Sequence, residues 1–348
     1  MTEGSDGKFY GGCVYGGANN GGTLFKVSTS GTLTVLRALV AADGYNPVNA
    51  RIVQAADGNF YGTMYQGGSD GAGVIFRISS SGNYRVLHDF TGDADGGNPA
   101  AGLTLANDGN IYGNTSAGGN TTACTGNPPG CGVFFKLTTA GAYSVIYTLD
   151  GTKGLNPQSN LTLDTSGVFY GITFSGGPYG QGVFYSLNTE LAPFASLVST
   201  AGKEGAKLGI LGQGFNNSTV VKFNGVQATT VMRTGTTFLS ATVPAGALTG
   251  AVTVTTGRTA LTSLQTFKVT PTIASFSPPS GPVGTPVTIT GTGLMQTTAV
   301  TFNGTSATFT VNSDTQVTAT VPTGATTGRI SIVTPGGTAN SATSFTVN

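Results

Sequence analysis

Hydrophobic and polar positions in the first part of the chain follow a pattern that returns about every 51 residues. Each unit opens with a segment of the type Asp-Gly-Xaa-Phe-Tyr-Gly and continues with a Gly-Gly pair and further apolar runs. The opening segments begin at Asp6, Asp57, Asp108 and, more loosely, Ser166. Short apolar runs between Gly, Asn and Asp turns, without a helical period, predict β-strands joined by tight turns.

Three more predicted strands complete each unit. The first follows the Gly-Gly pair, at 23–27, 74–78, 133–137 and 183–187. The next covers 33–39, 84–90 and 143–149, and Phe194 to Val198 fits the same place in the last unit. A fourth element follows an Asn-Pro pair, at Val48 to Ala55, Ala101 to Ala106 and Gln158 to Asp164. Four short strands per unit predict a β-propeller-like array of blades, with the recurrent Tyr and Phe packed between blades.

Counted as a blade, the first unit has the second, third and fourth strands but no predicted first strand, because few residues precede Asp6. A missing strand leaves an open sheet edge at which another strand can pair. Three explanations remain open: the chain belongs to a longer protein with more blades, the ring tolerates a short blade, or another chain supplies the strand. A ring of four blades is at the small end of the known range, which favours the first explanation.

From about residue 200 the pattern changes to Thr and Val residues that alternate with a period of two. Val221 to Gly225 returns as Val300 to Gly304, and Ala241 to Gly246 returns as Ala319 to Gly324. This alternation predicts half-buried strands, and six or seven of them in about 80 residues suit a small immunoglobulin-like β-sandwich. The predicted cores are aliphatic and include Phe223, Phe267, Phe302 and Phe345.

These motifs resemble two known families. Residues 271–348, with the segment Ser277 to Gly284 and the Gly-Thr-Gly-Leu motif at Gly291, resemble the IPT/TIG immunoglobulin-like domain. Residues 200–270 resemble a more divergent copy without the Pro-Xaa-Ser-Gly opening. Within the domain predicted over 1–199, about residues 1–190 resemble the GloVer tandem repeat of large bacterial secreted or surface proteins. The GloVer resemblance implies an extracellular location and a propeller-like array, and it carries over no catalytic residue. The repeats and the alternating strands predict an all-β chain with about four blades, the first of them incomplete.

Composition narrows the classes of function. Charged residues make up 8% of the chain and the formal net charge is +1, which argues against a nucleic-acid binder that neutralises phosphates. No apolar run approaches the roughly 20 residues of a membrane-spanning helix. Thr, Ser, Asn and Gly are abundant and Lys and Glu are scarce, as in secreted and cell-surface proteins. Residues 1–4 do not begin a signal peptide, so such a segment was removed or the chain starts inside a longer reading frame.

Two of the three cysteines are close in sequence. Cys124 and Cys131 flank a Gly/Pro segment that is short enough to bring its ends within disulfide reach. A disulfide is favoured, and a pair of free thiols stays open. A zinc site would need four ligands, and the single His88 cannot supply the shortfall. Cys13 is left without a partner and is predicted to be buried in a strand.

Groups that could carry out acid–base chemistry are few. A Ser-His-Asp site would need His88 and Asp89, but neighbouring strand residues point to opposite faces, so we expect His88 to be structural. The Asp residues that precede Gly in the repeats are predicted to form turns. Asp93 and Asp95 resemble a calcium loop only faintly, without its bidentate Glu, and calcium binding there stays open. No catalytic residue, metal ligand or cofactor site is therefore predicted.

Three functions fit this pattern. The first is a non-catalytic extracellular binding or adhesion protein, whose propeller loops contact polysaccharide or other surface proteins while the sandwiches form a stalk. The second is a self-assembling structural subunit, a homo-oligomer in which a strand from another chain fills the open edge. The third is a polysaccharide-active enzyme, which would need two or three carboxylates at one opening. The sparse carboxylates argue against it.

Overall fold

The computed structural model describes residues 1–47 and 52–348, and these residues form an all-β fold, as predicted. They divide into two compact units, Met1–Ala192 and Pro193–Asn348. The one helical turn in the described part is the 3-10 helix η1 (Ala41–Asp43). No helix among the described residues has the length and apolar character needed to cross a bilayer. The predicted strand from Val48 to Ala55 lies partly outside the described residues.

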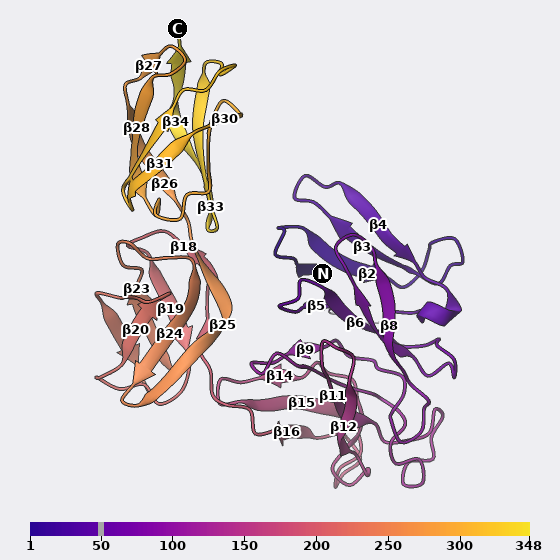
Figure 1. Ribbon diagram of the computed structural model, residues 1–348. Helices are drawn as coiled ribbons and strands as arrows, with labels where there is room; N and C mark the ends of the chain where they lie inside the picture. The colour runs from indigo at the N-terminus through magenta and orange to yellow at the C-terminus, as the bar shows by residue number, and fades with distance from the viewer. Residues whose placement is uncertain (48–51) are drawn as a thin grey trace. The chain divides into compact units, whose positions relative to one another are not determined.

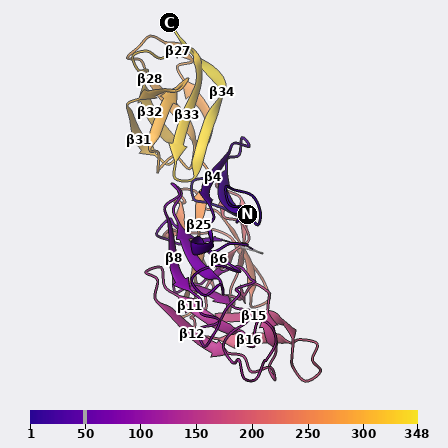
Figure 2. The same ribbon diagram turned by 90° about the vertical axis from the view of Figure 1, so that its right-hand side faces the viewer.

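The first unit consists of four antiparallel sheets, which follow one another along the chain as blades in both views (Figures 1 and 2). Blade 1 contains β1 (Thr2–Glu3), β2 (Phe9–Cys13), β3 (Thr23–Val27) and β4 (Leu33–Ala38). Blade 2 contains β5 (Val53–Gln54), β6 (Phe60–Met64), β7 (Val74–Ile78) and β8 (Tyr84–Asp89). Blade 3 contains β9 (Thr104–Leu105), β10 (Ile111–Asn114), β11 (Val133–Leu137) and β12 (Tyr143–Thr148). Blade 4 contains β13 (Leu155–Pro157), β14 (Thr162–Leu163), β15 (Val168–Ser175) and β16 (Phe184–Asn188).

Blade 1 has its first strand, so the prediction that this strand is missing was wrong. β1 pairs with β2 through Thr2 opposite Tyr10 and Glu3 opposite Phe9. The matching strands β5, β9 and β14 are also two residues long. The few residues before Asp6 are therefore enough to supply a first strand.

Blade 4 is the blade that lacks a strand. Blades 1 to 3 each end in a fourth strand, but β16 pairs only with β15 among the described residues. The segment Phe194 to Val198, predicted for this place, instead contains β17 (Ser196–Leu197), which pairs with β19 (Lys207–Leu211) of the second unit. That prediction was wrong, and the predicted boundary at residue 199 put this strand in the wrong unit.

Neighbouring aromatic residues of each repeat enter different cores, because successive strand residues point to opposite faces of a sheet. In blade 2, Phe60 packs toward blade 1 beside Tyr10, whereas Tyr61 packs toward blade 3 beside Phe135. The same alternation places Tyr112 between blades 3 and 4. The prediction that the recurrent Tyr and Phe fill the spaces between blades is confirmed.

The second unit contains two β-sandwiches with the same strand order. One sheet of the first sandwich has the order β17, β19, β23 (Phe238–Thr242), β22 (Val231–Thr234). Its other sheet has the order β18 (Ala201–Gly202), β25 (Thr259–Val269), β24 (Gly250–Thr256), β20 (Val220–Phe223), β21 (Val226–Gln227). One sheet of the second sandwich has the order β26 (Thr272–Ser277), β28 (Pro286–Thr292), β32 (Gln316–Thr320), β31 (Phe309–Ser313). Its other sheet has the order β27 (Ser280–Gly281), β34 (Gly337–Val347), β33 (Gly328–Thr334), β29 (Ala299–Phe302), β30 (Thr305–Ala307).

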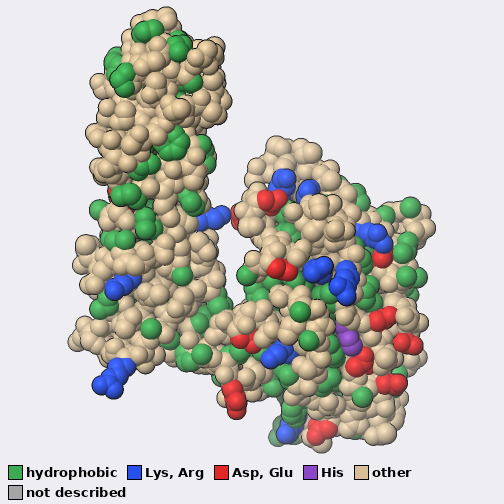
Figure 3. All heavy atoms as spheres, in the orientation of Figure 1, with side chains coloured by type: hydrophobic (Ala, Val, Ile, Leu, Met, Phe, Trp, Pro, Cys, Tyr) green, Lys and Arg blue, Asp and Glu red, His purple; other side chains and the backbone are tan. Residues whose placement is uncertain are grey.

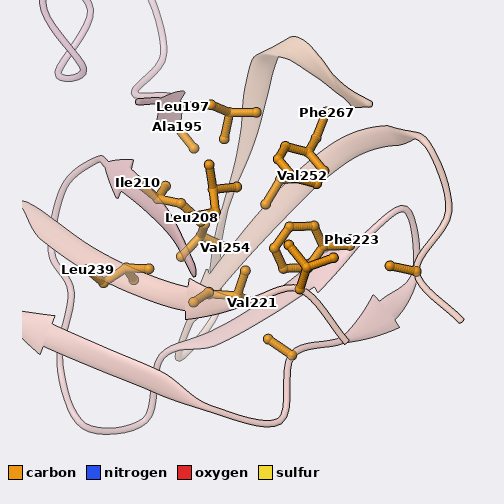
Figure 4. Close-up of a cluster of buried hydrophobic side chains, with 14 of the residues drawn as sticks. Ala195, Leu197, Leu208, Ile210, Val221, Phe223, Leu239, Val252, Val254 and Phe267 are labelled. Carbon is orange, nitrogen blue, oxygen red and sulfur yellow. The ribbon is translucent and has the colours of Figure 1, made fainter. Parts of the chain in front are cut away.

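The sandwich cores are aliphatic with paired phenylalanines, as predicted. Phe223 and Phe267 form a T-shaped pair with ring centroids 5.2 Å apart, and Phe302 and Phe345 repeat this geometry at 5.2 Å. Figure 4 shows the first of these cores, into which Leu197 of β17 also points. The reassigned strand thus supplies part of the first sandwich core.

Matched phenylalanines of blades 3 and 4 test the packing between blades. Phe134 and Phe184 occupy equivalent positions in β11 and β16, but Phe134 is 2% exposed and Phe184 is 72% exposed. We expect Phe134→Ala to lower the free energy of unfolding by about 3–5 kcal/mol because it leaves a cavity. In dilute solution Phe184→Ala should cost about 0.5 kcal/mol or less. Urea unfolding of the two variants measures the difference, and equal losses would contradict it.

Glu204 gives the second unit a pH dependence. Burial, together with a hydrogen bond to Asp314, raises the pKa of Glu204 to about 7, and its Oε1 accepts a hydrogen bond from the Gly246 N–H at 2.7 Å. The folded state then binds a proton more tightly than the unfolded state, so stability should fall as pH rises from about 4.5 to 7. Glu204→Gln should lose this pH dependence, because Gln stays neutral. Calorimetric melting of the parent chain and of Glu204→Gln from pH 4.5 to 7 measures this pH dependence. Parallel plots of melting temperature against pH for the two proteins would contradict the prediction.

Candidate functional site

A disulfide closes the loop that precedes β11 in blade 3. Cys124 and Cys131 are bonded, with Cα atoms 5.2 Å apart, so the favoured alternative from the sequence is the one found. Cys131 is fully buried, whereas Thr125 to Pro129 between the two cysteines are exposed. The bond therefore anchors an exposed Gly/Pro loop, here called the disulfide loop (124–131), to the core of blade 3. Cys13, at the end of β2, is exposed, so the prediction that it is buried was wrong.

Backbone hydrogen bonds at the Gly-Gly pair of blade 3 position the disulfide loop. The Gly118 N–H donates to Pro129 O at 2.9 Å, and the Gly119 N–H donates to Asp93 O at 2.6 Å. Both glycines have positive φ angles, which glycine adopts without strain. A Cβ atom at Gly118 would lie 2.5 Å from the backbone of Gly96. This pair thus holds the disulfide loop and the Asp93 loop together at one end of the blades.

Two clefts flank the disulfide loop, and Tyr65, Asn127 and Pro128 line both. The first has a volume of about 390 Å³ and is also lined by Ser116, Asn156 and Gln158. The second has a volume of about 450 Å³ and is also lined by Gln66, Asp70, Asp93 and Asn98. Together they are called the loop clefts. Most of these polar side chains are amides or hydroxyls, which both donate and accept hydrogen bonds.

The Asn-Pro turn of blade 2 holds Tyr65 in place between the loop clefts. Asn98 has a φ of 52°, in the left-handed region that Asn tolerates better than most residues. Its Nδ2 donates to Tyr65 O at 3.1 Å, and its own carbonyl accepts from Ser116 Oγ at 2.6 Å. A Cβ atom at Gly73 would lie 2.8 Å from Cδ of Pro99, so the proline packs closely on this glycine. Tyr65 therefore reaches the clefts from a fixed backbone.

His88 has a structural environment, as predicted. Its ring stacks on Tyr143 with centroids 3.7 Å apart, and its Nε2 lies 3.1 Å from Asp95 Oδ2. Burial lowers the pKa of His88 despite the nearby Asp95 carboxylate. Asp89 accepts hydrogen bonds from Ser69 instead, at 2.7 and 2.9 Å, and does not orient His88.

The repeated carboxylates are bound within their own turns. Tyr61 donates to Asp57 Oδ2 at 2.7 Å, and the Asn59 N–H donates to Asp57 Oδ1 at 3.0 Å. Burial alone would raise the pKa of Asp57, but hydrogen bonds from the Asn59 side chain, the Tyr61 hydroxyl and the Asn59 N–H outweigh it and lower the pKa. Burial and the bond to Asp6 raise the pKa of Tyr10 to about 12 in blade 1. These carboxylates act as turn formers, in line with the sequence interpretation.

Asp93 and Asp95 do not share one site. Asp95 accepts hydrogen bonds from the backbone N–H and the hydroxyl of Thr91 and lies beside His88, whereas the Asp93 side chain is exposed at a loop cleft. Three or more His, Cys, Asp or Glu side chains are nowhere grouped for a metal ion within residues 1–47 and 52–348.

A separate aromatic groove of about 190 Å³ lies between blades 3 and 4 and is lined by Phe134, Tyr147, Lys153 and Tyr185. It is called the aromatic groove. The Lys153 ammonium lies 5.7 Å from the centre of the Tyr147 ring. Tyr147 belongs to the last strand of blade 3, and blade 4 has no matching strand to cover it.

Charged side chains are unevenly distributed over the chain. In the face shown in Figure 3, red and blue side chains gather over the first unit, and the face of the last sandwich is mostly uncharged. The sequence contains only three charged residues beyond residue 260, Lys268, Asp314 and Arg329, and only Asp314 and Arg329 belong to the last sandwich. The surface of the last sandwich is therefore suited to a role that needs little electrostatic attraction.

The families of two segments can be assigned by comparison. Residues 1–126 match the family model of the Gloeobacter/Verrucomicrobia repeat, and residues 271–347 match that of the IPT/TIG domain. The chain joins Gloeobacter/Verrucomicrobia repeats to an IPT/TIG domain. Blade 4 continues the repeat array beyond the matched range, and the first sandwich has the strand order of the IPT/TIG domain. No curated protein matches the chain.

Solved structures with some likeness to this chain have several different functions. SGBP-B from a xyloglucan utilization locus of Bacteroides uniformis is 23% identical, with a TM-score of 0.22 over 44% of this chain and 50% of that one. PbSGBP-B, a surface glycan-binding protein from Prevotella bryantii, is 17% identical, with a TM-score of 0.31 over 46% and 40%. A fungal alcohol oxidase of the AA5 family in complex with copper is 12% identical, with a TM-score of 0.37 over 99% and 96%. The chain spans half or less of the two bacterial proteins, and at these TM-scores none of the three supports a conclusion about function.

Thiol reactivity tests the cysteine assignment. The native chain should have one thiol that reacts with Ellman's reagent, Cys13, because Cys124 and Cys131 are bonded to each other. Denaturation without a reductant should not raise the number of reactive thiols. Reduction followed by denaturation should make all three cysteines reactive. A native chain with no reactive thiol, or additional thiols in denaturant without reductant, would contradict the assignment.

Proposed function

We propose that this chain is a non-catalytic binding protein of the cell surface or extracellular space that holds polysaccharide in the loop clefts. The lining of these clefts carries the proposal. Tyr65 offers an aromatic face and a hydroxyl, and Asn127 and Gln158 offer amides that can donate and accept hydrogen bonds. Sugar hydroxyls need the same mixture of donors, acceptors and apolar surface.

The scaffold around the clefts supports a binding role. The disulfide and the bonds to Gly118 and Gly119 fix the loop before a ligand arrives, which lowers the entropy lost on binding. Disulfides persist mainly in oxidising compartments, so this bond supports a location outside the cytosol. The last sandwich contains only two charged residues, Asp314 and Arg329, which suits a spacer.

The contacts of Asp57, Asp95 and Asp108 favour binding over hydrolysis. A glycoside hydrolase usually needs two carboxyl groups about 5–9.5 Å apart, one of them free to donate a proton. Asp57 and Asp108 accept hydrogen bonds from the tyrosine of their own repeat, and Asp95 is held by Thr91 and His88. These groups are occupied by structural contacts, which supports a protein that holds its ligand unchanged.

Affinity electrophoresis against a panel of soluble uncharged polysaccharides tests this function. Tyr65→Ala and Asn127→Ala should each weaken the retarding interaction by about tenfold, equivalent to about 1.4 kcal/mol. Tyr147→Ala, in the aromatic groove, is the matched control and should bind normally.

Four results would overturn the proposal. Retardation that Tyr147→Ala abolishes and Tyr65→Ala leaves intact would move the site to the aromatic groove. Retardation that persists in both Tyr65→Ala and Tyr147→Ala would place the binding site elsewhere. A chain that binds no polysaccharide of the panel would favour a protein ligand. Release of reducing sugar during the assay would show catalysis.

A further inference from the structure

Each blade has two apolar faces that belong to different contacts. The face turned to the next blade is called the leading face, and the face turned to the preceding blade is called the trailing face. Leading faces contain a tyrosine of the opening segment and a large apolar residue of the following strand. In blades 1 to 3 these residues are Tyr10 and Leu24, Tyr61 and Ile75, and Tyr112 and Phe134. All six are at most 2% exposed, so every leading face between two blades is covered.

The leading face of blade 4 keeps the apolar residues but has no blade against it. Tyr170 occupies the tyrosine position and Phe184 the place of Phe134, and their rings stack with centroids 5.7 Å apart. Phe184 is 72% exposed, and Ile172 and Phe174 on the same face are 55% and 70% exposed. Large apolar side chains grouped on one exposed face are uncommon in a soluble monomer and often mark an interface.

This face has also lost the charges of the other leading faces. Where blades 1 to 3 have a basic residue opposite the tyrosine, blade 4 has Ser186. Where they have the aspartate that binds the tyrosine, blade 4 has Ser166. Ile172 stands where blades 2 and 3 have Thr63 and Asn114. The terminal leading face is thus more apolar than the faces that are already buried.

The trailing face of blade 1 is the other uncovered face. Trailing faces of blades 2 and 3 bury Phe60, Phe76 and Ile78, or Ile111, Phe135 and Leu137, at most 1% exposed. Blade 1 has Phe9, Phe25 and Val27 at these positions, and they are only half-buried. Leu33 and Val35, which pair with Val27 and Phe25 across β3 and β4, are 59% and 53% exposed.

One uncovered face is a leading face and the other is a trailing face, and at every contact between blades in this chain a leading face packs on a trailing face. We propose that the leading face of blade 4 packs on the trailing face of blade 1 of a second copy, head to tail. The chain itself shows this type of contact three times, between blades 1 and 2, 2 and 3, and 3 and 4. Two copies would bring together eight blades, within the known range of about four to eight for closed propellers.

This contact is heterologous, because the two surfaces that meet are different. Heterologous contacts close into a ring when the rotation allows it and otherwise form an open filament. The assembly does not depend on strand exchange or on the polysaccharide site, since the loop clefts include none of these residues. It therefore goes beyond the proposed binding function and can fail independently of it.

Two single variants, each with a charge on one face, test the contact. Sedimentation velocity of the full chain over a wide concentration range should show assembly that grows with concentration. Phe184→Asp places a charge on the leading face of blade 4, and Val35→Asp places one on the trailing face of blade 1. Each variant therefore loses one of the two contact surfaces and should remain a monomer on its own. An equimolar mixture should form a one-to-one dimer and nothing larger, because one intact contact remains.

Controls separate this result from misfolding and other contacts. Both residues are exposed, so both variants should keep the circular dichroism spectrum and melting of the dilute parent chain. Met232→Asp, at an exposed apolar residue of the second unit, should assemble like the parent. A parent chain that stays monomeric at all concentrations would overturn the proposal. So would a mixture that stays monomeric, or a Val35→Asp variant that assembles alone.

Discussion

The first unit depends on the packing of apolar faces between neighbouring blades. A four-stranded sheet of this kind is apolar on both faces, so it cannot bury its side chains without a neighbour on each side. The adjacent pair Phe60 and Tyr61 shows the consequence, because one ring enters the core toward blade 1 and the other enters the core toward blade 3. Blades 2 and 3 are covered on both sides, and blades 1 and 4 are each covered on one.

Polar contacts position the ends of the blades once the cores are formed. Tyrosines buried between blades direct their hydroxyls to an aspartate of their own turn, as Tyr112 does to Asp108 at 2.9 Å. The Asn-Pro turns and Gly-Gly pairs then set the loops around the disulfide. The two sandwiches need no such devices, because each buries the inner faces of its own two sheets around a pair of phenylalanines.

The sequence predicted the parts of the fold that have a strong period. The blades, the sandwiches and the buried phenylalanines follow from repeated apolar positions. The strand at Thr2–Glu3 was missed because two residues carry no periodic signal, and Phe194 to Val198 was misplaced because its apolar pattern suits a blade or a sandwich equally. The loop clefts could not be predicted, since Tyr65, Asn127 and Gln158 are far apart in sequence and are brought together by backbone hydrogen bonds. The short Gly/Pro loop between two cysteines was the available signal.

Hydrogen–deuterium exchange of the full chain, followed by peptide at the lowest measurable concentration, tests the dependence of each blade on its neighbours most directly. We expect the strongest protection in β6, β7, β10 and β11 of the doubly covered blades, and faster exchange in β3, β4 and β16 of the terminal blades. Uniform protection across the four blades, or the strongest protection in a terminal blade, would contradict it.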